Sequence, residues 1–166
     1  MNPDNDLSLV TAQERELILP GFDEEVAWRI GLRLRSFAVE RSFSVVIDVR
    51  RFEQPLFYNA LPGTSPDNFD WARRKSNVVA RFHRSSYAIG LKLQQKQSSL
   101  IETYALPDRD YAAHGGSFPI VVSGAGIVGS ATVSGLPQRA DHELVVEALC
   151  AECGKDYTKL ALPPSV

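Results

Sequence analysis

The chain has few of the features that mark secreted or nucleic-acid-binding proteins. Only two of its 166 residues are cysteine, Cys150 and Cys153, so no disulfide framework is expected. The first ten residues, MNPDNDLSLV, have neither the basic nor the apolar region of a signal peptide. The net charge of −2 gives no electrostatic reason to expect nucleic acid. These absences predict a cytoplasmic protein with no nucleic-acid partner.

Charged residues are also missing from a long internal stretch. Residues 112–138 contain no Asp, Glu, Lys or Arg, although 23% of the chain is charged. Pro119, Gly124, Gly126 and Gly129 interrupt the apolar runs well before the roughly 18 residues that a membrane-spanning helix needs. The stretch therefore predicts two short buried strands joined by glycines, and no membrane partner.

The rest of the composition fits one globular domain over residues 1–166, with short flexible tails. Hydrophobic residues make up 44% of the chain, which is long enough to bury a core. Helices are expected from Thr11 to just before Pro20 and at 23–41, 67–83, 85–97 and 141–154, and strands at 44–50, 54–60, 118–123 and 127–134. Strand pairs separated by helices favour an α/β (α+β) fold with an antiparallel sheet flanked by helices.

Polar residues suggest where several helices begin. Thr11 and Glu14 have the spacing of a capping box, in which two side chains satisfy free backbone donors reciprocally. Asp67, Ser85 and Asp141 each precede an apolar periodic segment and are expected to cap it.

The expected helix at 23–41 has apolar residues on two sides. One stripe consists of Val26, Ile30, Leu34 and Phe37, and the other of Trp28, Leu32 and Val39. Two apolar faces predict that the helix is buried twice, once on the sheet and once on another surface.

Two motifs invite a functional interpretation that their context does not favour. Gly124-Ala-Gly126-Ile-Val-Gly129 has the glycine spacing of a dinucleotide-binding loop, but β-branched residues follow it where that loop needs a helix. A hairpin turn is the better interpretation. Cys150 and Cys153 lie near a helix end, whereas redox cysteine pairs lie where a helix begins, so they are expected to pack.

Lys75 and His114 are the candidates for chemistry. Lys75 lies in the apolar stripe of Trp71 and Val78, so its ammonium either points inward or extends along the surface to solvent. His114 is the one titratable side chain in the uncharged stretch, and it is either a metal ligand or proton donor or a hydrogen-bonded turn residue. No spacing of serine, histidine and carboxylates indicates a catalytic set, so catalytic residues stay unassigned.

Several of these segments together resemble a known family. The strings HGGSFPI and GIVGSATVSGLPQRADHELVVEAL are similar to the Gly-Gly-x-Pro-Ile and Val-Ser-Gly signature of the GlcG/HbpS-like "heme-degrading domain" family. The residues that fit its uncharacterised UPF-type branch are Asp67, Asn68, Trp71, Arg74, Lys75, Ser85 and Ser86. The resemblance extends over about residues 22–149.

The resemblance implies a profilin-like fold, assembly into dimers or higher rings, and heme or corrinoid binding in some members. It also implies that the middle-helix lysine and the Gly-Gly turn line a crevice. The expected ligand-binding residues are Trp71, Lys75, His114, Gly115, Gly116 and Pro119. Lys75 would pair with a ligand carboxylate, the glycine amides would donate to it, and Trp71 would offer a stacking face. No separate metal site is expected.

Three functions follow from these features. The first is a small cytoplasmic oligomer that binds heme, another tetrapyrrole or a small anionic ligand. The alternative is an oligomeric protein–protein interaction adaptor without small-molecule chemistry, suggested by the two-faced helix at 23–41. An enzyme that opens the heme ring oxidatively ranks last, because no catalytic residues can be named.

Overall fold

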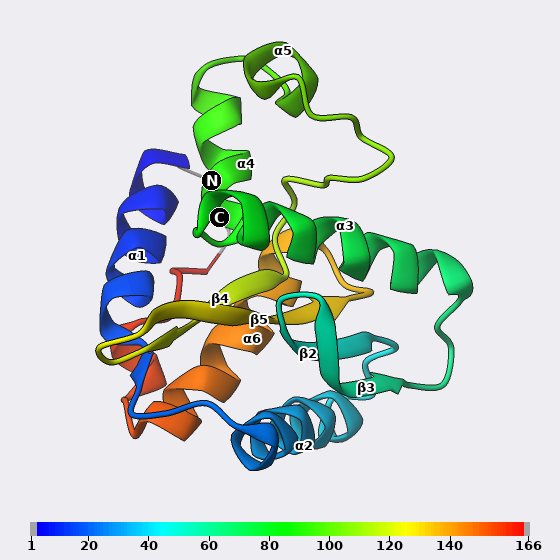
Figure 1. Cartoon of the computed structure of the whole chain (residues 1–166), viewed down its shortest axis with the longest axis vertical. Coiled ribbons are helices and arrows are strands. Elements are labelled where there is room, and N and C mark those ends of the chain that lie inside the picture. Colours follow the sequence, from blue (N-terminus) through cyan, green and yellow to red (C-terminus); the bar gives the residue numbers. More distant parts are fainter. Residues whose placement is uncertain (1–2, 165–166) are drawn as a thin grey trace.

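A computed structural model describes residues 3–164 of the chain. The helices are α1 (Pro3–Glu16), α2 (Glu24–Glu40), α3 (Pro66–Phe82), α4 (Ser86–Gln95), α5 (Leu100–Tyr104), α6 (Gln138–Cys153) and the 3-10 helix η1 (Tyr157–Lys159). The strands are β1 (Ile18–Leu19), β2 (Val46–Arg51), β3 (Gln54–Ala60), β4 (Ser117–Val122) and β5 (Gly126–Ser134). Figure 1 shows a sheet flanked by helices, which confirms the predicted α/β fold.

The five strands form one sheet in the order β1-β4-β5-β2-β3. The β2–β3 and β4–β5 hairpins are antiparallel, as is the pairing of β2 with β5, so the predicted antiparallel sheet is confirmed for the four longer strands. The two-residue strand β1 was not predicted and pairs with β4 in parallel. Gly124 and Gly126 have positive φ values at the β4–β5 turn, which confirms the hairpin interpretation of the glycine motif.

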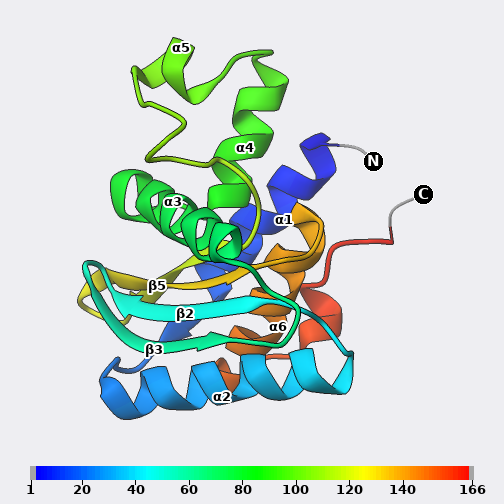
Figure 2. The same ribbon diagram turned by 90° about the vertical axis from the view of Figure 1, so that its right-hand side faces the viewer.

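The two faces of the sheet differ in chemistry. Ile47, Val49, Ala131 and Val133 belong to an apolar core that includes buried residues of α2 and α6. Because successive side chains of a strand point to opposite faces, the intervening residues face α3, and they are largely polar. The buried ones are Asp48, Ser130, Thr132 and Ser134. Figure 2 shows α3 on one side of the sheet and α2 on the other.

Helices α1, α4 and α5 lie beside this sandwich. Val10 of α1 packs with Tyr87, Ala88 and Leu91 of α4 in a second apolar cluster. A buried hydrogen bond of 2.8 Å joins His142 Nε2 of α6 to Gln13 Oε1 of α1. None of the helices in the described part of the chain is long and apolar enough to cross a membrane.

The predicted start of the first helix is wrong. Thr11 lies inside α1 and its hydroxyl donates to the carbonyl of Leu7 at 2.8 Å, while Glu14 accepts the backbone N–H of Ser85 at 2.8 Å. Residues 3–10, which precede the predicted helix, are helical because their apolar side chains find partners on α4. Short flexible tails at the two ends stay a prediction, and residues 1–2 and 165–166 lie outside the described residues.

Of the caps predicted for α3 and α4, the first is wrong and the second is confirmed. Ser65 caps α3, with Pro66 at the first helical position and the Asn68 side chain accepting from the Ser65 backbone, so Asp67 is not the cap. Ser85 does cap α4, as predicted, through a bond from the Ala88 N–H. The short helix α5 was not predicted, because a five-residue helix gives almost no periodic signal.

Only one apolar face of α2 is buried within the chain. Ile30, Leu34 and Ala38 have no exposed surface. The other predicted stripe remains open, with Trp28 53%, Leu32 44% and Val39 52% exposed. The predicted second burial of this helix therefore does not occur within the described chain.

Helix α2 approaches β3 closely at Gly31. A methyl group at this position would overlap the ring of Phe57, which is only 7% exposed. The ring of Phe57 also makes an edge contact with Trp28, with ring centroids 5.4 Å apart. Because Gly31 has no side chain, α2 can lie directly on β3.

We expect Gly31→Ala to destabilise the protein, against the usual gain of about 1 kcal/mol for this change inside a helix. Overpacking in a filled site costs about 1–3 kcal/mol, so the free energy of unfolding should fall by about that amount. Urea unfolding measures the change, and Gly31→Ala combined with Phe57→Leu should recover part of the loss. A single variant more stable than the parent would contradict the close contact.

Candidate ligand-binding site

A buried ion pair joins α3 to α6. Nζ of Lys75 lies 2.7 Å from Oδ2 of Asp141, and the two side chains are only 4% and 1% exposed. Nζ also donates to the carbonyl oxygen of Val133 in β5 at 3.3 Å. Of the two alternatives for Lys75, the structure has the inward one, because the sheet face under α3 is polar enough to receive an ammonium group.

Asp141 has a different role from the one predicted. Pro137 is the N-cap residue of α6, and Asp141 lies in the first turn. Its carboxylate accepts the backbone N–H groups of Leu136 at 3.0 Å and Gly135 at 3.4 Å. Burial raises the pKa of Asp141 and lowers that of Lys75, and in each case the opposite charge of the partner works against the shift. Asp141 therefore accepts backbone N–H groups just before α6 and also pairs with Lys75.

The Gly-Gly turn meets this pair directly. Gly116 has φ of +130°, and a side-chain carbon there would lie 2.8 Å from Nζ of Lys75 and would overlap the Val133 carbonyl. The N–H of Gly115 donates to Oε1 of Gln138 at 3.2 Å. Only glycine at position 116 lets the backbone of this turn lie so close to the ammonium group of Lys75.

Trp71 and His114 form an aromatic pair beside the turn. Their ring centroids are 5.2 Å apart and the planes are inclined by 79°. The indole N–H of Trp71 donates to Asp67 at 3.2 Å. The side chain of His114 is exposed at the surface, yet partial burial and the positive charges of Lys75 and Arg74 lower its pKa, so its imidazole is largely neutral at pH 7. Within residues 3–164 no hydrogen bond holds this imidazole.

Two hollows adjoin the aromatic pair. One, of about 250 Å³, borders the Lys75–Asp141 pair, and the other, of about 500 Å³, lies between α3, α4 and residues 98–114. Trp71, His114 and Gln138 border both. The larger hollow has the volume of a small-molecule site.

The predicted site residues are brought together to different degrees. Trp71, Lys75 and His114 line the smaller hollow, and the buried Gly115 and Gly116 form the turn behind them. Pro119 is buried in β4, paired with Ser130, and borders neither hollow.

Sequence reasoning missed Arg74, Gln138 and the pairing of Asp141. Arg74 is not among the expected ligand-binding residues, yet its guanidinium lies 4.1 Å from the centre of the Trp71 ring and lines the larger hollow. Its position three residues after Trp71 on a helix was the available signal. No sequence signal connects Lys75 with Asp141, because 66 positions separate them.

The two cysteines lie near the end of α6, as expected. Burial raises the pKa of Cys150 to about 11 and also raises that of Cys153, so neither thiol is activated. Among the described residues no group of three or more His, Cys, Asp or Glu side chains could hold a metal ion.

Comparisons with known proteins show that the chain belongs to a known family. Residues 22–150 match the family described as "Haem degrading protein HbpS-like". A UPF0303 protein of Acidobacterium capsulatum is 63% identical over 158 residues, which covers 95% of this chain and 96% of the relative. The crystal structure of the Ybr137w protein superposes with a TM-score of 0.83 at 27% identity, covering 89% of this chain and 87% of that one.

A structure named for its bound heme has a related fold. The PduOC:heme complex superposes with a TM-score of 0.68 and covers 79% of this chain and 94% of that one. Its sequence identity is 14%, so this likeness concerns the fold alone.

We expect Lys75→Met to lower the free energy of unfolding by about 3–5 kcal/mol at pH 7, because it leaves the Asp141 carboxylate buried without its cation. The loss should shrink as the pH falls, since protonation of Asp141 removes the unpaired charge. Urea unfolding between pH 4 and 7 measures both effects.

The matched control is Lys75→Met with Asp141→Asn, which removes both charges and keeps an acceptor for the Leu136 N–H. This double variant should regain most of the stability and lose most of the added pH dependence. A loss below about 1 kcal/mol for Lys75→Met would mean that the pair is not desolvated.

Proposed function

Because the chain belongs to the HbpS-like haem-degrading family and to its UPF0303 group, we propose that it is a small-molecule-binding protein. Its ligand is heme, another tetrapyrrole or a smaller anionic compound, held at the crevice of Trp71, Lys75, His114 and the Gly115–Gly116 turn. A cytoplasmic location and self-association belong to the same proposal.

The observation that carries this proposal is the free imidazole of His114 between the two hollows. A neutral imidazole is a ligand for heme iron, and Trp71 offers an aromatic surface beside it. The larger hollow, of about 500 Å³, has a mixed lining in which apolar side chains such as Leu91 and Leu100 suit a flat ring system. These residues fit a heme group, which when bound would supply an iron centre for redox or oxygen chemistry.

The other crevice residues have supporting roles. The ammonium of Lys75 is already neutralised by Asp141, so it stabilises the floor of the crevice more than it attracts a ligand. We assign binding and not turnover, because within the described chain His114 has no hydroxyl or thiol partner that it could activate as a nucleophile and no carboxylate that orients it. The name of the PduOC:heme complex supports heme as the first ligand to test.

Titration of the purified protein with hemin should produce a Soret band shifted from that of free hemin. His114→Ala should remove the shift, whereas His83→Asn should retain it, because His83 borders neither hollow. Asn suits the left-handed backbone of His83, where φ is +52°. A parent spectrum identical to that of free hemin would rule out heme as the ligand.

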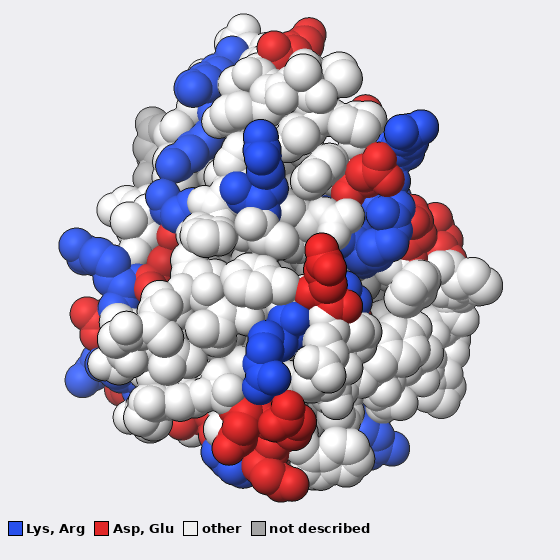
Figure 3. All heavy atoms as spheres, in the orientation of Figure 1, with Lys and Arg blue, Asp and Glu red and all other residues white. Residues whose placement is uncertain are grey.

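A second function, assembly through the open face of α2, is favoured by one specific pattern. Glu25, Trp28, Leu32 and Arg35 are exposed at spacings of three, four and three residues, which is one helix face. Trp28, Leu32 and Arg35 also border a hollow of about 310 Å³ with residues of β3. The surface over β3 and the loop after it is largely uncharged at the lower right of Figure 3.

The order of residues on this face is complementary to itself. Two copies of α2 that pack antiparallel about a two-fold axis near residue 30 would place Trp28 against Leu32 and Glu25 against Arg35. Each copy would then cover the other's apolar pair and flank it with opposite charges. We therefore propose self-association through this face, which is also the surface that an adaptor would use.

Light scattering should give a mass of at least twice the 18.3 kDa of one chain. Arg35→Glu should shift the protein toward the monomer, because it sets two carboxylates against each other, and adding Glu25→Arg should restore the assembly. Ile101→Glu on α5, 52% exposed and outside this face, is the control and should leave the mass unchanged. A parent protein that is monomeric at micromolar concentration would contradict the assembly.

A further inference from the structure

The larger hollow has apolar walls and an arginine at its border. Tyr87 and Leu91 of α4 and Leu100 of α5 contribute to the walls, and Arg74 of α3 lies beside Trp71 where the hollow meets the aromatic pair. Ser98 and Ser99 add hydroxyl groups. Asp108 also lines the hollow. The hollow thus combines space for a flat apolar body with one guanidinium group and one carboxylate at its border.

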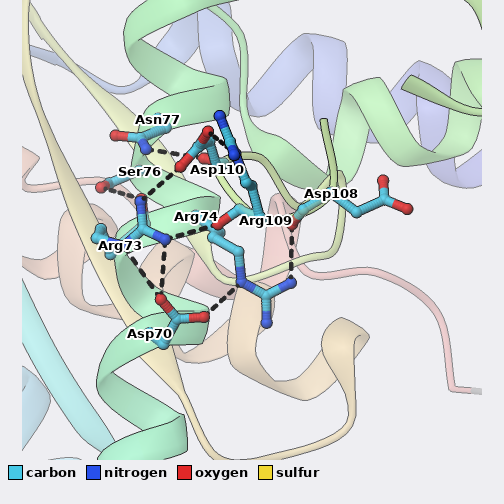
Figure 4. Close-up of polar contacts among 8 residues, drawn as sticks. All are labelled: Asp70, Arg73, Arg74, Ser76, Asn77, Asp108, Arg109 and Asp110. Carbon is cyan, nitrogen blue, oxygen red and sulfur yellow. Dashed lines mark hydrogen bonds and ion pairs between the residues drawn. The ribbon is translucent and has the colours of Figure 1, made fainter. Parts of the chain in front are cut away.

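Arg73 and Arg74 both fasten the segment after α5 to α3, as Figure 4 shows. Arg73 donates to the carbonyl of Arg109 at 2.7 Å, and Arg74 donates to that of Asp108 at 3.3 Å. Both also bind the carboxylate of Asp70, at 2.9 and 2.8 Å. The two arginines are therefore nearly equivalent in what they do for the fold.

They differ in how fully their charges are matched. Arg73 has a second carboxylate, Asp110, at 3.5 Å, whereas Arg74 shares Asp70 as its one carboxylate partner in the described structure. The carboxylate of Asp108 points away from Arg74 in Figure 4. Nη2 of Arg74 makes no hydrogen bond within residues 3–164. Arg74 thus has an unsatisfied hydrogen-bond donor at the border of the hollow, and its positive charge is only partly neutralised.

Burial strengthens this difference. The Arg74 side chain is 14% exposed and that of Arg73 34%, so the charge of Arg74 is the less screened by water. Stacking on Trp71 fixes the plane of the guanidinium, and a fixed planar fork binds a carboxylate through two parallel hydrogen bonds. Lys75 cannot take this role while Asp141 holds its ammonium group.

We propose that Arg74 is the anion-binding residue of the site and that the larger hollow takes a planar aromatic compound with one acidic group. The ring system lies against the apolar walls and the acid binds Nη1 and Nη2 of Arg74, displacing the long bond to the Asp108 carbonyl. This assignment rests on the proposed function of the crevice and gives its ligand a chemical class that is independent of iron.

Isothermal titration with 2-naphthoate and with its uncharged analogue 2-naphthamide tests the assignment. The parent protein should bind the acid at least tenfold more tightly than the amide. Arg74→Gln should abolish that preference and leave amide binding in place. Arg73→Gln should retain the preference for the acid. This variant loses the same contact to Asp70 and a similar contact to the segment after α5.

The outcomes separate this assignment from heme binding. Equal affinities for acid and amide, no binding of either compound, or equal losses in the Arg73 and Arg74 variants would overturn the role of Arg74, even if hemin still produces a Soret shift. A preference for the acid that disappears only in Arg74→Gln supports the role, even if hemin does not bind.

Discussion

The buried pair of Lys75 and Asp141 is the interaction on which the rest of the site depends. Removing two charges from water is costly, and the pair persists because the Val133 carbonyl and the Gly135 and Leu136 amides complete its hydrogen bonds. It joins α3 to the start of α6 across the end of β5. Trp71 lies one helical turn before Lys75, and His114 lies two residues before Gly116. The contact of Gly116 with the ion pair therefore also sets the distance between the rings of Trp71 and His114.

The sheet separates the apolar core from the proposed binding crevice. Its apolar face packs on α2 and α6 and contains most of the core, while its other face has small polar side chains and passes under α3. A helix above small side chains can bring charged groups close to the sheet. Lys75 and both hollows beside Trp71 lie toward α3, and Asp141 reaches Lys75 from the start of α6 past the end of β5.

The two surfaces proposed for binding and for assembly are built differently. The crevice is built from segments distant in sequence, and its charged groups are largely paired except at Arg74. The open face of α2 is built from one helix and depends only on the spacing of its side chains. Because α2 and α3 lie on opposite sides of the sheet (Figure 2), assembly through α2 would leave the crevice accessible.

The sequence by itself determined the four longer strands, most of the helices and the class of fold, because helix and strand periodicity and glycine turns are encoded within a few residues. It left two directions open for the Lys75 side chain, and the family resemblance implied that this lysine and the Gly-Gly turn line one crevice. Only the tertiary structure decided that Asp141 neutralises Lys75, that Arg74 lies over Trp71 at a cavity, and that one stripe of α2 stays exposed. Such pairings depend on which distant segments meet, and no short-range pattern records that.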